Sequence, residues 1–163
     1  MRSSRRSSPS RRAIVGLVPA VVLVVAAVGA CSPDLQTRTG GVPPTPEITD
    51  AWVRLPMGGS DMTAAYMTIR GASRDVRLVS ATSPSATSVT LHQTTTDASG
   101  TTGMSEVTEI RVPASATVRL EPGGYHLMLE GLKAPLNAGS RVELNLVFDD
   151  GVSATVQAEV RAG

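Results

Sequence analysis

The chain has very little of three side-chain types that often define a protein's chemistry: thiols, aromatic rings and imidazoles. Its 163 residues include one cysteine, four aromatic residues and two histidines. A single cysteine excludes a disulfide within the chain, so stability has to come from an apolar core. Because aromatic residues are so few, that core must be built from Val, Leu, Ile, Met and Ala.

Two functional classes are disfavoured by what is missing. The chain has no basic patch interleaved with aromatic residues, which argues against nucleic acid as a partner. It has neither a Gly-x-Ser-x-Gly elbow nor a His-Glu-x-x-His motif, and its acidic residues are scattered rather than paired. We therefore expect a protein that is not an enzyme.

The N-terminus has the pattern of an export signal of the bacterial lipoprotein type. Five arginines precede an uncharged, mostly apolar run from Ala13 to Ala30, and Val28-Gly29-Ala30-Cys31 is a small-residue cleavage site ending in cysteine. We predict a signal peptide over residues 1–30, with Cys31 as the lipidated first residue of the mature protein. An uncleaved membrane anchor is the alternative. Both place the rest of the chain at the extracytoplasmic face of the cell membrane, in a periplasm or at the cell surface.

The charge and composition change after the signal. Removing residues 1–30 leaves ten basic side chains against fourteen acidic ones, so the formal net charge falls from +1 to about −4. Residues 31–47 are rich in Pro, Gly and Thr and lack an apolar period, which predicts a flexible tether. Residues 48–160 then have the length of one domain.

Within this domain the hydrophobic pattern has a period of two. Gly, Pro, Asp and Ser clusters separate nine predicted strands: Ile48 to Leu55, Met62 to Arg70, Val76 to Thr82, Val89 to Thr94, Met104 to Ile110, Thr117 to Leu120, Tyr125 to Glu130, Val142 to Phe148 and Thr155 to Val160. Such a series favours an all-β sandwich or barrel. No segment shows a capped 3.6-residue stripe, so we expect helices to be minor.

Four soft or borderline metal ligands stand out against this scaffold: His92, Met104, His126 and Met128. His126 and Met128 are two residues apart, which places both on one face of a strand, and the alternation with Leu127 points them away from the core. His92 points outward for the same reason. Imidazole and thioether ligands favour Cu(I) over Mg²⁺ or Ca²⁺, which prefer oxygen.

The segment between His92 and Met104 is expected to form a hairpin. If the turn is centred on Ala98, the two residues are directly opposed, with Cβ atoms about 5 Å apart. The other internal methionines are assigned differently: Met62 and Met67 to a buried strand, and Met57 to a loop as a possible auxiliary ligand.

The two aromatic residues in the first two predicted strands are interpreted as packing residues. Trp52 and Tyr66 are expected in the core or at its rim rather than as stacking platforms for a ligand.

The same residues carry a resemblance to a known family. The motifs Asp50-Ala51-Trp52-Val53-Arg54, Ala65-Tyr66-Met67, Leu91-His92, Met104 and Gly123 to Leu136 resemble the PCuAC family of extracytoplasmic copper chaperones. The family pattern has a histidine, about ten residues, a methionine, 21 residues, and then His-x-Met. Here 21 residues separate Met104 from His126, whereas 11 separate His92 from Met104.

The resemblance implies a cupredoxin-like β-sandwich that binds one Cu(I) through His92, Met104, His126 and Met128. The implied role is delivery of copper to the copper-accepting subunit of cytochrome c oxidase, or to another extracytoplasmic copper protein. A blue-copper electron carrier would need a cysteine thiolate, which the mature chain cannot supply. Copper storage or resistance, and a metal-free structural or adhesive β-sandwich lipoprotein, are the alternatives.

Overall fold

The computed structural model describes residues 43–163, so the predicted signal peptide, Cys31 and most of the predicted tether lie outside the described residues. Ten strands are present: β1 (Glu47–Arg54), β2 (Thr63–Arg70), β3 (Val76–Thr82), β4 (Ser88–Thr96), β5 (Thr102–Glu106), β6 (Ile110–Val112), β7 (Thr117–Leu120), β8 (Tyr125–Glu130), β9 (Arg141–Phe148) and β10 (Ser153–Arg161). The predicted all-β class is confirmed. Residues 43–163 contain no helix long and apolar enough to cross a membrane.

Eight of the nine predicted strands are present, with ends shifted by two residues at most, and the ninth is divided. The predicted strand from Met104 to Ile110 is wrong as a single element because its two halves pair with different partners. β5 pairs with β4, whereas β6 pairs with β3. The chain leaves β4 at Val107, whose N–H still donates to the Leu91 carbonyl at 2.8 Å.

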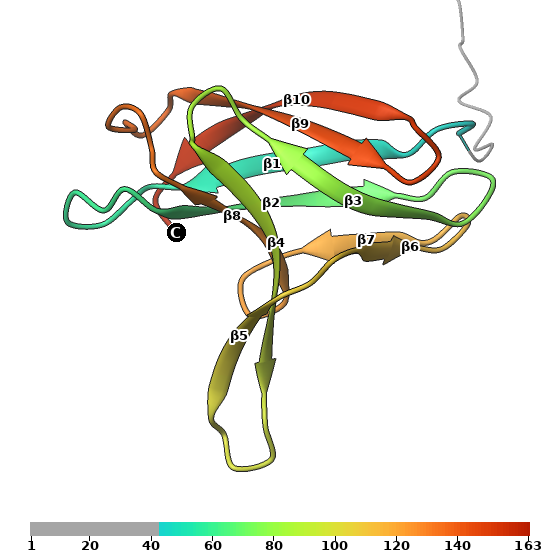
Figure 1. Cartoon of the computed structure of the whole chain (residues 1–163), viewed down its shortest axis with the longest axis horizontal. Coiled ribbons are helices and arrows are strands. Elements are labelled where there is room, and N and C mark those ends of the chain that lie inside the picture. The colour runs from blue at the N-terminus through green and yellow to red at the C-terminus, as the bar shows by residue number, and fades with distance from the viewer. Residues whose placement is uncertain (1–42) are drawn as a thin grey trace, which may run out of the picture. The chain divides into compact units, whose positions relative to one another are not determined.

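The strands are hydrogen-bonded in the order β5-β4-β8-β7-β2-β1-β10-β9-β3-β6, with an additional pairing of β8 with β2 (Figure 1). β5 and β6 are at opposite ends of this order, yet only three residues separate them in sequence. A linker of that length brings the Cα atoms of Glu106 and Ile110 within roughly 14 Å of each other. The sheet therefore curls back on itself, so that its two end strands are joined by one short linker without pairing, and it encloses one core.

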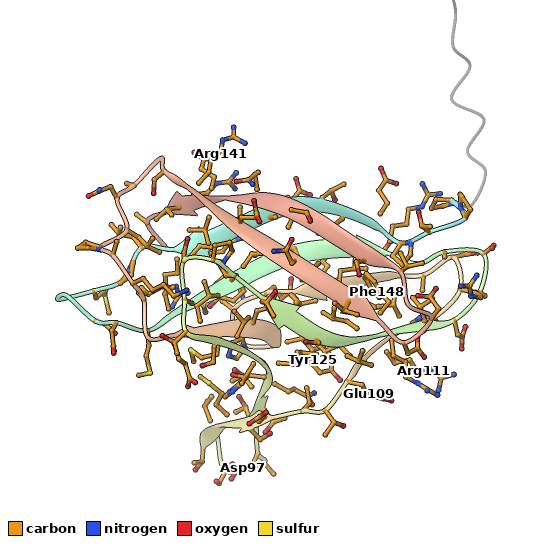
Figure 2. The ribbon with its side chains drawn as sticks, turned by 45° about the horizontal axis from the view of Figure 1, so that its top comes forward. Asp97, Glu109, Arg111, Tyr125, Arg141 and Phe148 are labelled. Atoms are coloured by element: carbon orange, nitrogen blue, oxygen red, sulfur yellow. The ribbon has the colours of Figure 1, made fainter. Side chains whose placement is uncertain are left out.

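The core inside the curled sheet is almost entirely aliphatic. On β9 the buried residues Val142, Leu144, Leu146 and Phe148 alternate with partly buried or exposed ones, as the period-two pattern predicts. Phe148 is the only phenylalanine of the chain and lies within the body (Figure 2). Other large, fully buried side chains include Ile69, Leu78, Ile110, Leu127 and Leu129. Each contributes about 1.5–3 kcal/mol through its burial.

The β4–β5 hairpin projects from the body of the domain (Figure 1). Its tip is a five-residue loop, because Thr96 pairs with Thr102. Asp97 closes this loop: its carboxylate accepts the backbone N–H groups of Ser99 and Thr101, each at 2.9 Å. Figure 2 shows Asp97 at the end of the projection. Every residue of β5 is exposed, so this strand forms a free edge beside β4.

Candidate metal centre

A row of side chains crosses five neighbouring strands on one face of the sheet. Trp52 of β1 pairs with Tyr66 of β2, and their rings are 4.5 Å apart between centroids. The Tyr66 ring lies 6.3 Å from the His126 ring on β8. His126 pairs with His92 of β4, which in turn pairs with Glu106 of β5. Paired residues of antiparallel strands share a face, so both histidines lie on the same side of the sheet.

The His126 ring has a fixed protonation pattern. The residue is only 3% exposed, and Nδ1 lies 3.1 Å from the Gly124 carbonyl oxygen. That oxygen also accepts the Thr94 N–H at 3.0 Å. Because a carbonyl only accepts, Nδ1 must carry the proton, which leaves the lone pair on Nε2.

Burial favours the neutral form of this imidazole. The pKa of His126 is lowered from its ordinary value mainly by burial, with smaller contributions from the charges of His92 and Arg54, while the bond to Gly124 opposes the shift. A neutral histidine whose other nitrogen is held by a backbone carbonyl is the usual state of a metal-binding histidine.

The free nitrogen of His126 faces a sulfur. Met104 of β5 places Sδ 3.3 Å from Nε2. With the proton on Nδ1, neither atom has a hydrogen to donate, so two lone pairs face each other across this distance. A soft cation between or beside them would be held by both donors. The Met104 residue is 54% exposed, so one side of the pair is open to solvent.

Met128 completes a group of three donors around a cavity. It lies two residues beyond His126 in β8, on the same face, where it pairs with Thr90 of β4 and Ala64 of β2. His126, Met104 and Met128 all line a cavity of about 460 Å³. The strand spacing of the His-x-Met motif thus places its two side chains on one face, as predicted, and both line this cavity.

His92 lies beside this group without lining the cavity. Its ring centroid is 5.7 Å from that of His126. Its Nδ1 is buried and has no hydrogen-bond partner among residues 43–163. A buried polar atom without a partner is costly, and metal ligation is one way to satisfy it.

The ligand atoms at this site are nitrogen and sulfur. Among residues 43–163, no three side chains of the types His, Cys, Asp and Glu gather closely enough to hold a metal ion. Besides the two histidines, the donor side chains grouped at this position are the methionine thioethers. That composition suits a soft ion such as Cu(I) and suits Zn²⁺, Ca²⁺ or Mg²⁺ poorly.

One feature of the predicted geometry is wrong, and another is incomplete. Met104 pairs with Thr94 and not with His92, because the loop is centred on Ser99, one residue later than expected. The thioether remains on the predicted face but reaches His126 instead. His126 points away from the core, as predicted. It is nevertheless buried, because Tyr66 and Met104 cover it from strands that alternation along β8 cannot reveal.

Met62 is also placed differently from the prediction. It precedes β2, is 50% exposed and lines the same cavity, whereas Met67 is buried as predicted. Met62 lies four residues before Tyr66, so an extended chain places both side chains on the same face. This spacing could have identified the face of Met62. The predicted packing roles of Trp52 and Tyr66 are confirmed, but both rings lie in the row that leads to His126. Sequence reasoning did not foresee this second use of Tyr66.

Arg54 is a further residue of this region that sequence reasoning missed. It lines the cavity, and its guanidinium carbon lies 5.7 Å from the centre of the Tyr66 ring. A cation stacked on an aromatic ring is a favourable arrangement. It also places a fixed positive charge beside the three donors.

Residues 47–160 match the family model of LpqE-like proteins, described as "Putative lipoprotein LpqE-like". Among curated proteins, the chain is 39% identical over 116 residues to "Putative lipoprotein Lxx21020" of Leifsonia xyli subsp. xyli, covering 71% of this chain and 69% of that protein. It is also 28% identical over 103 residues to "Uncharacterized protein RP573" of Rickettsia prowazekii, covering 60% of this chain and 55% of that protein.

Among solved structures, the Cu(I) form of DR1885 from Deinococcus radiodurans is 36% identical, with a TM-score of 0.62, over 80% of this chain and 87% of that one. The copper-bound PCuAC domain from PmoF2 is 27% identical, also with a TM-score of 0.62, over 76% of this chain and 97% of that one. The cupredoxin-like fold implied by the resemblance is confirmed by these matches.

Proposed function

We propose a copper-chaperone function for this chain, which belongs to the LpqE-like family and whose described residues form a domain of the PCuAC type. One Cu(I) is carried as cargo by His92, Met104, His126 and Met128. The observation that carries this proposal is the Nε2 atom of His126, fixed without a proton and facing the Met104 sulfur at 3.3 Å. Two of the similar solved structures hold copper, which supports the choice of metal.

The ligands favour Cu(I) over Cu(II) and bind it reversibly. Thioethers and neutral imidazoles are uncharged, so they bind Cu(I) without the strong electrostatic attraction that anionic thiolates add. Burial favours the neutral form of His126, which leaves Nε2 available to the metal. The site therefore binds the ion while leaving a stronger ligand set able to remove it.

The two halves of the site differ in exposure, and this difference sets a route for release. His126 is buried in the sheet, whereas Met104 is on an exposed edge strand of the projecting hairpin. An incoming thiolate from a partner replaces the Met104 sulfur first and the β8 ligands afterwards. Copper moves by ligand exchange, so its oxidation state does not change and no catalysis is involved.

The receiving partner that fits this chemistry is an extracytoplasmic protein with a copper site containing two thiolates. We assign the copper-accepting subunit of cytochrome c oxidase to this role. The location is supported by the match to lipoproteins. A lipid anchor at Cys31 would hold the domain at the extracytoplasmic face of the membrane, near such an acceptor.

The direct test is an anaerobic Cu(I) titration of the full chain in a Cys31→Ser background, which removes its only thiol. We expect one Cu(I) per chain, with both sulfur and nitrogen neighbours in X-ray absorption. His126→Asn with Met128→Leu should abolish tight binding, and Met67→Leu, which removes a thioether from the core, should have no effect. Coordination by nitrogen and oxygen alone would refute the assignment.

Delivery is tested separately from binding. Mixing the Cu(I)-loaded chain with the metal-free copper-binding domain of an oxidase should transfer copper to the two thiolates. If copper binds in the titration but is not transferred, storage or resistance becomes the better description of the role.

A further inference from the structure

Four of the five methionines in the described part of the chain line one cavity. Met104 and Met128 belong to the proposed copper site, and the other two are Met57 and Met62. Met57 is 85% exposed and Met62 is 50% exposed. Such positions gain little from hydrophobic burial. The core therefore does not explain why the cavity has two additional thioethers at its rim.

The segment that carries these two thioethers is built around a turn. Gly58 and Gly59 have φ values of 62° and 76°, a backbone conformation that favours glycine. A Cβ atom placed on either glycine would have nothing within 4 Å apart from its neighbours in the chain, so the turn is open to solvent. The Ser60 N–H donates to the Met57 carbonyl at 3.1 Å, and the Ser60 hydroxyl bonds to the backbone of Met62. Methionine has three rotatable side-chain bonds, so both sulfurs can adapt to an ion at the cavity mouth.

We propose that Met57 and Met62 form an outer thioether pair that takes up Cu(I) first and passes it to the proposed copper site through the inner ligands that line the same cavity, His126, Met104 and Met128. This inference rests on the proposed copper function and adds the path that the ion follows. Each step is a ligand exchange. A bond from copper to an outer sulfur breaks as a bond to an inner sulfur or to Nε2 of His126 forms, and copper stays Cu(I).

The outer pair is suited to brief residence. Two neutral thioethers bind Cu(I) more weakly than a set that includes imidazole nitrogen. Arg54 lines the same cavity, and its positive charge opposes a cation at the outer and the inner ligands alike. The difference in donors therefore sets the direction, and the ion moves inward to the imidazole nitrogen during loading. During release, the same pair lies on the path outward.

Binding at the outer pair is tested in the full chain with Cys31→Ser and His126→Asn, labelled with ¹³C on the methionine methyl groups. Ag(I), which has the same charge as Cu(I) and does not oxidise, should shift the methyl signals of Met57 and Met62. The signal of Met67 should not move. Unmoved Met57 and Met62 signals at excess Ag(I) would overturn the inference, whether or not the inner site binds copper.

The route is tested by the rate of transfer. In the Cys31→Ser background, Met57→Leu with Met62→Leu removes both sulfurs and keeps apolar side chains of similar size. We expect Cu(I) uptake from a chelator, and release to one, to slow by about tenfold each, because losing an intermediate raises the barrier in both directions. Met67→Leu is the matched control. Unchanged rates would overturn the route, and so would a loss of affinity as large as that of Met104→Leu, since Met57 and Met62 would then be resident ligands.

Discussion

Replacing His126 with alanine should weaken the metal-free domain as well as remove copper binding. The buried ring donates a hydrogen bond to the Gly124 carbonyl and packs beside Tyr66 and His92. Losing this bond lowers the free energy of unfolding by about 1 kcal/mol, at the low end for a buried group. The cost is small because the Gly124 carbonyl still accepts the hydrogen bond from the Thr94 N–H. The space left by the ring adds roughly 1–2 kcal/mol. We expect the free energy of unfolding of the metal-free domain to fall by about 2–3 kcal/mol in total.

Two further variants separate packing from ligation. His126→Asn keeps an N–H donor near the position of Nδ1, so it should recover about 1 kcal/mol of the loss while still lacking the Nε2 ligand. Met104→Leu removes a ligand from an exposed strand and should change stability by less than about 0.5 kcal/mol. It should also weaken Cu(I) binding less than the paired loss of His126 and Met128.

The assay is urea unfolding of the metal-free chain followed by circular dichroism, with a copper chelator present throughout. For a domain of this size, the His126→Ala loss corresponds to a melting temperature lower by roughly 10 °C. If His126→Ala is as stable as the wild type, the burial of this ring has been misinterpreted. If His126→Asn is as unstable as His126→Ala, the Gly124 bond does not fix the ring.

Three other outcomes are expected. Cys31→Ser should prevent incorporation of a labelled fatty acid and release the protein from the membrane, and an unlabelled wild type would contradict the lipoprotein assignment. Acidification should destabilise the metal-free domain: burial lowers the pKa of His126 in the folded state, so below the ordinary value of about 6.5 the unfolded chain takes up a proton first. Urea midpoints at pH 7.5 and 5.5 measure this loss, which His126→Asn should reduce. In cells, deletion of the gene should lower oxidase activity at limiting copper, with recovery on copper addition, and unchanged activity under strict limitation would remove oxidase from the proposed role.

The sequence predicts the strands well because their signal is local. Alternation along Val142 to Phe148 and along Tyr125 to Glu130 depends only on which residues face the core, and both strands form where predicted. The common face of His126 and Met128 follows from the same two-residue period. Local patterning therefore predicts the fold class and the common face of two of the four candidate ligands, His126 and Met128.

Alternation cannot predict what covers the outer face of a strand. The burial of His126 depends on Tyr66 from β2 and Met104 from β5, which are 60 and 22 residues away in the sequence. The division of the predicted strand from Met104 to Ile110 has a similar origin, because the chain leaves β4 after β5 and β6 then pairs with β3 at the other end of the sheet order. Both results depend on how the sheet curls, and one strand's sequence does not contain that information.

The spacing between His92 and Met104 differs from the family pattern by one residue, and the hairpin explains why this matters little. An extra residue within a paired strand would turn Met104 to the opposite face. Instead, pairing is regular up to Thr96 and Thr102, and the five residues between them form the loop closed by Asp97. The Met104 sulfur still meets His126 at 3.3 Å. The additional residue is thus absorbed at the tip of the hairpin, so the departure from the family spacing is no reason to exclude Met104 from the proposed ligands.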